Sequence, residues 1–209
     1  MTITRYEQSG TIIKSNSGQT LGIDIGALTP IEKLAGITVD QMLVSHIHAD
    51  HCSADQILAL NPAAVYAGAE CLTALGGTGV NLTELTAGET VTIGNFTVTP
   101  FEVDHGPSAP QVPEQNFGFL IEVDGEVIYF AGDMFTPSGI DVTDLSVDVA
   151  LLPVGGHFTF DPEAALSFAQ TFASIRNIYP MHHEAVGPID TEGGKKFTEL
   201  ASGTFTIAG

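Results

Sequence analysis

Short runs of apolar and β-branched residues, bounded by Gly, Asn, Asp or Ser, recur along the whole chain. Runs of about 4 to 8 such residues between turn signals predict β-strands. The dipeptide Asp124-Gly125 lies between two of the runs and is a strong hairpin signal. We expect strands at 2–6, 10–14, 20–25, 42–44, 65–67, 90–93, 96–103, 117–123, 127–130, 147–154, 175–181 and 203–207.

A helical period is clear in only one place. The apolar residues Ala165, Phe168, Ala169 and Phe172 recur at i, i+3, i+4 and i+7, behind an N-cap candidate, Asp161. This pattern predicts an amphipathic helix that packs on a sheet. Shorter helices are expected at 30–34, 53–60, 69–75 and 193–200. Because no repeat or linker interrupts the 209 residues, we expect one domain spanning 1–209.

The chemistry of the chain is concentrated in the run His46-Ile47-His48-Ala49-Asp50-His51, which follows the apolar run 42–44. It holds three of the seven histidines. Alternation along an extended segment places His46 and His48 on one side, and Asp50 and His51 follow in the turn. Imidazole and carboxylate together suit Zn²⁺, with Mn²⁺ and Fe²⁺ as the next candidates. The run therefore predicts a metal site just past a buried strand.

The same run resembles the His-x-His-x-Asp-His motif of the metallo-β-lactamase superfamily at every ligand position. Three later residues resemble the remaining motifs in the same order, each beyond an expected strand: His105 in Val-Asp-His-Gly, Asp133 in Phe-Ala-Gly-Asp and His182 in Pro-Met-His. The resemblance covers nearly the whole chain. It implies an α+β fold, an αββα sandwich of two mixed sheets flanked by helices.

The resemblance also implies a site for two divalent metal ions. It assigns one metal to three histidines, a second metal to Asp50 and two histidines, and a bridging position to Asp133. The first set is His46, His48 and His105, and the second is Asp50, His51 and His182. His183 competes with His182, because adjacent residues on an extended segment point to opposite sides and only one should reach the metal. We favour His182, since Pro-Met-His resembles a small hydrolase branch that includes sugar-lactonase-like proteins.

A further stretch, Leu-Leu-Pro-Val-Gly-Gly-His-Phe-Thr at 151–159, resembles the same branch. Its histidine, His157, has three possible roles: an acid that faces the substrate, a group that orients a metal ligand, or a structural histidine. His157 or His183 could donate a proton to the leaving group, and Asp50 and Asp133 would position the attacking hydroxide.

The implied reaction is hydrolysis, in which water bound to the two metals supplies a hydroxide that attacks a small ester, lactone or phosphoester. Two alternatives come from other classes. One is a diiron oxidoreductase on the same scaffold, although that group carries Glu at the position of His48. The other is a metal-binding protein without catalysis, which the intact set of ligands disfavours.

Charge narrows the range of partners. Six Lys and Arg oppose 25 Asp and Glu, so the net charge is −19, which repels nucleic-acid phosphates and anionic lipids. We therefore expect a small-molecule substrate, with neither nucleic acid nor a membrane as a partner. No apolar run approaches the ~18 residues of a membrane span, and no signal peptide precedes the first strand, so we expect a cytoplasmic protein. A homo-oligomer is compatible with the sequence, which does not decide the matter.

Overall fold

The computed structural model describes residues 1–107, 111–183 and 192–208. The N-terminal part forms a six-stranded sheet with the strands in sequence order, antiparallel from β1 to β3 and parallel from β3 to β6. Its strands are β1 (Thr2–Arg5), β2 (Thr11–Lys14), β3 (Thr20–Ile23), β4 (Gln41–Val44), β5 (Ala64–Ala67) and β6 (Asn81–Glu84).

The second sheet has seven strands in the order β13-β12-β11-β10-β9-β8-β7. It is antiparallel from β7 to β10 and parallel from β10 to β13, so it is also mixed. Its strands are β7 (Val91–Ile93), β8 (Phe96–Glu102), β9 (Phe117–Val123), β10 (Glu126–Phe130), β11 (Ser146–Pro153), β12 (Ser174–Met181) and β13 (Thr206–Ile207).

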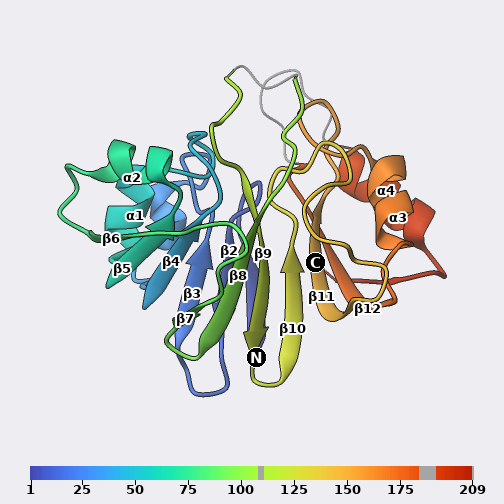
Figure 1. Ribbon diagram of the computed structural model, residues 1–209, viewed down its shortest axis with the longest axis horizontal. Coiled ribbons are helices and arrows are strands. Elements are labelled where there is room, and N and C mark those ends of the chain that lie inside the picture. Colours follow the sequence, from blue (N-terminus) through green and yellow to red (C-terminus); the bar gives the residue numbers. More distant parts are fainter. Residues whose placement is uncertain (108–110, 184–191, 209) are drawn as a thin grey trace.

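Helices cover the outer faces of both sheets (Figure 1). The first sheet carries the short 3₁₀ helix η1 (Ile31–Leu34), α1 (Ala54–Leu60) and α2 (Ala69–Leu75). The second sheet carries α3 (Pro162–Ala169) and α4 (Gly193–Ala201), which pack against each other. The expected αββα sandwich of two mixed sheets flanked by helices is thus confirmed.

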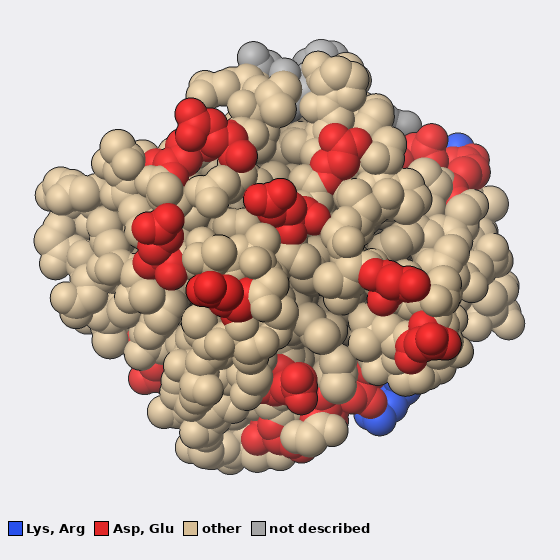
Figure 2. Space-filling model, viewed as in Figure 1, with Lys and Arg blue, Asp and Glu red and all other residues tan. Residues whose placement is uncertain are grey.

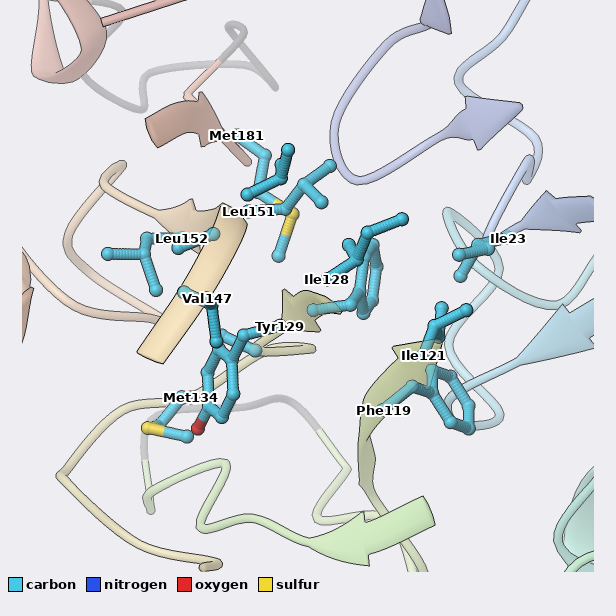
Figure 3. Close-up of a cluster of buried hydrophobic side chains, with 14 of the residues drawn as sticks. Ile23, Phe119, Ile121, Ile128, Tyr129, Met134, Val147, Leu151, Leu152 and Met181 are labelled. Carbon is cyan, nitrogen blue, oxygen red and sulfur yellow. The ribbon is translucent and has the colours of Figure 1, made fainter. Parts of the chain in front are cut away.

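Apolar side chains from the inner faces of the two sheets form the central core. Figure 3 shows Ile23 of β3 on one side of this core and Phe119 and Ile121 of β9 on the other. All three side chains are fully buried, and burial of each contributes about 1.5–3 kcal/mol. A separate cluster, including Ile57 and Leu75, lies between the first sheet and helices α1 and α2. Burial on both faces explains why the central strands read as apolar runs.

Three strands differ most from the sequence expectation. One is β13, which spans only Thr206–Ile207 although the sequence predicts a strand at 203–207. β6 was not expected, because Asn81–Glu84 is polar and mostly exposed and lies at the edge of its sheet, where burial imposes no apolar pattern. The strand expected at 20–25 ends at Ile23, because Asp24 adopts a left-handed conformation with φ of 50°. That early end turns the chain out of the sheet beside the histidine run.

Within the described ranges, no helix is long and apolar enough to cross a membrane.

Candidate metal centre

The predicted metal ligands come from segments that follow four different strands. The run His46 to His51 follows β4, and His105, Asp133 and His182 follow β8, β10 and β12. Pairing in the second sheet makes β8, β10 and β12 run in the same direction, so their carboxyl ends lie along one edge of the sheet, at the ends of the strands. That edge is the upper one in Figure 1. Ligands that are distant in sequence therefore converge at one end of the sandwich.

A single carboxylate oxygen, Asp133 Oδ2, lies at the centre of this convergence. The Asp133 side chain is only 2% exposed and is surrounded by imidazole rings from both sheets. The distances from Asp133 Oδ2 to the surrounding Nε2 atoms are 3.0 Å for His182, 3.2 Å for His51, 3.5 Å for His105 and 4.0 Å for His46. Four nitrogens that face one carboxylate form a compact donor set.

Asp50 supplies a second carboxylate at the open side of the cluster. Its Oδ2 atom lies 3.4 Å from Nε2 of His182 and 3.5 Å from Nε2 of His51. The Asp50 side chain is 23% exposed, whereas the Asp133 side chain is buried. Asp50 therefore lies on the solvent-accessible side of the buried donor set.

His48 lies on the other side of His46. Its Nδ1 atom is 2.9 Å from Nε2 of His46, and its Nε2 atom donates to the carbonyl of Gln111 over 2.6 Å. The rings of His46 and His48 lie 4.9 and 4.8 Å from the ring of His105. The three imidazoles thus form a group separate from Asp50 and His182.

Asp24 is the functional residue that sequence reasoning missed. Its carboxylate accepts hydrogen bonds from the Ser45 backbone N–H (2.7 Å), the Ser45 hydroxyl (2.6 Å) and His51 Nδ1 (2.9 Å). The only sequence signal for Asp24 is a lone acidic residue within the strand expected at 20–25. Its 0% exposure shows that the carboxylate belongs to the site and not to the surface.

Asp24 determines which ring nitrogens face the cluster. A carboxylate only accepts, so His51 must donate its Nδ1 proton and the Ser45 hydroxyl must donate its hydrogen to Asp24. The Ser45 oxygen then accepts from His46 Nδ1, 2.9 Å away. The neutral forms of His46 and His51 therefore carry the Nε2 lone pair toward Asp133. Such an arrangement orients imidazoles for metal binding.

The charges of the site are strongly coupled. Burial lowers the pKa of His46 well below its ordinary value, and the neighbouring His51 lowers it further. Burial also lowers the pKa of His182, but the neighbouring Asp133 carboxylate has the larger effect and raises the pKa of His182 to about 9. The pKa of His51 is likewise raised, and that of Asp133 is lowered despite its burial, because each faces opposite charge. Both carboxylates of the cluster are therefore ionised at neutral pH.

The donor set fits divalent metal ions better than it fits a hydrogen-bond network. Among the described residues, Nε2 of His51, Nε2 of His182 and both ring nitrogens of His105 are buried and make no well-aligned hydrogen bond, although Asp133 Oδ2 lies 3.0–3.5 Å from the three Nε2 atoms. Buried polar atoms are normally paired, so these nitrogens require another partner. Three groups have donor atoms close enough to hold an ion: His46, His48 and His105; His46, His51 and Asp133; Asp50, His51 and His182.

The structure brings His182 and not His183 into the cluster. β12 ends at Met181, and His182 adopts a left-handed conformation with φ of 55°, so strand alternation is not the cause. The His182 backbone N–H donates to the Gln8 carbonyl (3.0 Å), which also accepts from Arg5 (2.5 Å). His183 packs against Gly194 of α4, where an added Cβ would lie 2.6 Å from its ring.

His157 is exposed, with φ of 59°, and its ring lies against that of Phe158 with a centroid separation of 4.3 Å. Phe158, and not His157, lines the cavity beside the candidate metal ligands. Neither His157 nor His183 is brought to the cluster within the described part of the chain, so a proton-donor role for either stays a prediction.

A cavity of about 440 Å³ opens beside the cluster. Its polar wall includes His48, Asp50, His105, Asp133 and His182. Its apolar wall includes Ala27 and Leu28, from the loop after β3, and Phe158. This volume accommodates a small molecule in contact with the candidate metal ligands.

Comparison with known proteins identifies the family to which this chain belongs. A model described as the Beta-lactamase superfamily domain matches residues 2–182. A UPF0173 metal-dependent hydrolase from Myxococcus xanthus is 29% identical over 195 residues, or 87% of this chain and 70% of that protein. A UPF0173 metal-dependent hydrolase from Thermococcus onnurineus is 33% identical over 177 residues, and the match covers 77% of this chain and 75% of that protein. The structure of the metallo hydrolase Igni18 from Ignicoccus hospitalis, 22% identical, matches with a TM-score of 0.76 over 99% of this chain and 93% of that one.

Proposed function

Since the chain belongs to the β-lactamase superfamily and is a metal-dependent hydrolase, we propose that it cleaves a small ester, lactone or phosphoester at a site for two divalent ions. The observation that carries the binuclear site is the position of Asp133 Oδ2, within 4.0 Å of Nε2 of four histidines. One carboxylate amid four imidazoles from both sheets is suited to lie between two ions.

The proposed ligands divide into two groups that share Asp133. Three imidazoles would hold the first ion, and two imidazoles and Asp50 would hold the second. Such donors suit Zn²⁺ or, next, Mn²⁺ or Fe²⁺. The first group is His46, His48 and His105, and the second is Asp50, His51 and His182. Divalent ions bound there would lower the pKa of water toward about 7 and so make hydroxide available at neutral pH.

The residues of the chain have distinct tasks in this proposal. Asp24 holds His51 directly, and His46 through Ser45, with Nε2 toward the ions. Asp50 is the partly exposed carboxylate at the cavity, so it accepts a hydrogen bond from the attacking water and orients it toward the substrate. The apolar wall excludes bulk water from the substrate.

Metal analysis of the folded protein tests this proposal. We expect the protein, reloaded separately with Zn²⁺, Mn²⁺ or Fe²⁺, to hold close to two ions per chain, and to hydrolyse members of an ester, lactone and phosphodiester panel with at least one of these metals. A well-folded preparation that saturates at one ion contradicts the binuclear site. A preparation with two ions that turns over no member of the panel contradicts the proposed substrates.

A further inference from the structure

No Lys or Arg side chain of the described residues lines the cavity beside the cluster. Its lining combines the candidate metal ligands with the neutral residues Gln8, Ala27, Leu28, Ala49, Gln111 and Phe158. Residues 108–110 and 184–191 add no Lys or Arg, because their sequences contain none. A phosphorylated or carboxylated substrate is normally recognised by Arg or Lys, which pair with its charge. This cavity offers no such partner.

Each of the six Lys and Arg side chains either bonds to another group of the protein or lies away from the cavity. Arg5 donates to the carbonyls of Pro180 and Gln8, and Lys14 lies at the far end of β2 from the cluster. The other four are paired with carboxylates: Lys33 with Glu7, Arg176 with Asp148, Lys195 with Glu192 and Lys196 with Glu163. Figure 2 agrees, since acidic groups are spread over the face in view and the few basic groups lie beside acidic ones.

We propose that the substrate is an uncharged ester or lactone with an apolar portion, not a phosphorylated or otherwise anionic compound. This inference rests on the proposed function and selects among its substrate classes. The carboxylates Asp24, Asp50 and Asp133 would largely offset the positive charge of the bound ions. Beyond the metal ligands, an anionic group would contact only neutral side chains, in a protein of net charge −19. The charge of an anionic substrate would be desolvated without compensation.

The apolar wall supplies the recognition. Leu28, which is 38% exposed, and Phe158 both line the cavity, so an alkyl or aryl portion packed between them would cover apolar surface that now faces water. Covering such surface is favourable by about 25 cal/mol per Å². Leu28 and Phe158 are therefore specificity residues in this proposal.

The acidic surroundings also suit release of the product. In ester hydrolysis the oxygen of water bonds to the acyl carbon, the bond from that carbon to the alcohol oxygen breaks, and the alcohol oxygen takes up a proton. The carboxylic acid then loses its proton to solvent at neutral pH. An uncharged substrate thus becomes an anionic product, which the net charge of −19 repels.

A matched pair of substrates tests the inference on the metal-loaded protein. The 4-nitrophenyl ester of hexanoic acid and the mono-4-nitrophenyl ester of adipic acid share leaving group and chain length, and only the second carries a terminal carboxylate. We expect kcat/KM to be at least ~10-fold higher for the hexanoate, with the gap narrowing as salt screens the repulsion. Equal or faster turnover of the adipate ester overturns the inference.

A variant locates the selectivity. Leu28→Lys should shift the hexanoate-to-adipate ratio of kcat/KM at least ~10-fold toward the adipate, because it places a cation in the cavity wall. Leu58→Lys is the matched control, since Leu58 is also exposed but lies on α1 outside the cavity lining. If both variants change the ratio equally, the cavity wall does not select the substrate.

A binding measurement needs no turnover. Ligand-detected NMR should show that N-phenylhexanamide binds the metal-free protein more tightly than N-phenyladipamic acid does, and tighter binding of the acid overturns the inference. Hydrolysis of bis(4-nitrophenyl) phosphate in preference to both esters also overturns it, while the proposed metal-dependent hydrolysis stands. If the protein with two bound ions hydrolyses no probe, the proposed function itself fails.

Discussion

The two halves of the candidate metal centre are built in different ways. One half, His46 to His51, comes from a single turn after β4, and that turn is held by its own hydrogen bonds from the His51 and Cys52 N–H groups to the His48 carbonyl (2.9 and 2.7 Å). The other half, His105, Asp133 and His182, comes from three strand ends of the second sheet. Local bonding orders the first half, whereas strand pairing orders the second.

The turn half also depends on a close approach. A Cβ on Gly26, in the loop after β3, would lie 2.1 Å from the Asp50 carbonyl carbon. Only glycine lets that loop pack against the turn, and the packing brings Asp24 under His51. The turn is thus braced by the loop that follows β3.

The strand half is braced by side chains between strand ends. The Asn116 side-chain amide donates to the carbonyls of Asp133 (3.0 Å) and Val103 (3.3 Å), so it ties the segment after β10 to the segment after β8. Gly132 precedes Asp133 with φ of 61°, and a Cβ there would lie 2.4 Å from the Phe117 carbonyl oxygen. These contacts hold the segments after separate strands in place relative to one another. The difference between the halves is testable.

Loss of the shared carboxylate should have the largest effect. Asp133→Asn keeps the shape of the side chain but removes the charge that faces four imidazoles, so both ions should bind at least ~100-fold more weakly and hydrolysis should be lost. Metal content after dialysis measures this. Asp124→Asn in the β9–β10 turn, where φ is 57°, is the control and should retain both ions. If both variants behave alike, Asp133 does not bridge the two halves.

A change in the strand half alone should affect one ion. His182→Asn keeps a residue that tolerates φ of 55° but is too short to reach the cluster, so one of two ions should bind at least ~100-fold more weakly. His183→Asn should retain both ions, because the His183 ring packs on Gly194. Metal titration distinguishes the two variants. Loss of an ion in His183→Asn would reverse the assignment.

Substitution of Asp24, which supports the turn half, should have a smaller effect on metal affinity. Asp24→Asn is tolerated at φ of 50°, so it removes the charge that orients His46 and His51 without straining the backbone. We expect about a tenfold loss of metal affinity, the lower end of the range for residues that orient metal ligands. Calorimetric titration checks this value. An unchanged affinity would mean that the turn orients its histidines without Asp24.

An effect on metal binding is also expected from pH, without any mutation. The pKa of His182 is about 9 in the metal-free protein, so His182 carries a proton at pH 7 that a metal ion must displace. Metal affinity should therefore rise about tenfold from pH 7 to pH 8 for each proton displaced, and level off above pH 9. The stability of the metal-free protein should change with pH in the opposite direction to its metal affinity. A raised pKa stabilises the fold below pH 6.5, and this contribution is lost as pH rises through 9.

Proton release on metal binding, measured by calorimetry in buffers of different ionisation enthalpy, checks this prediction. In His182→Asn the release should decrease by about one proton at pH 7 to 8. If metal binding releases no protons in this range, the Asp133 carboxylate does not hold a proton on His182, and the strand half is less tightly coupled than the distances indicate.

The sequence by itself determined the features that depend on local pattern. Alternating and continuous apolar runs predicted most strands, because a strand buried on one or both faces must carry apolar residues at those positions. The run His46 to His51 predicted half of the donor set, because its residues share one turn. The resemblance to the superfamily added His105, Asp133 and His182, whose proximity no local rule requires.

Only the tertiary structure decided the remainder. β6 has no apolar pattern because an edge strand buries little surface, and Asp24 looked like part of a strand until its burial beneath His51 was seen. His182 rather than His183 faces Asp133 through a left-handed turn that strand alternation does not describe. The absence of Lys and Arg from the cavity lining is also a tertiary property, because it depends on where six scattered side chains lie in the fold. Contacts between residues far apart in sequence determine all of these features, so periodicity along the chain carries no record of them.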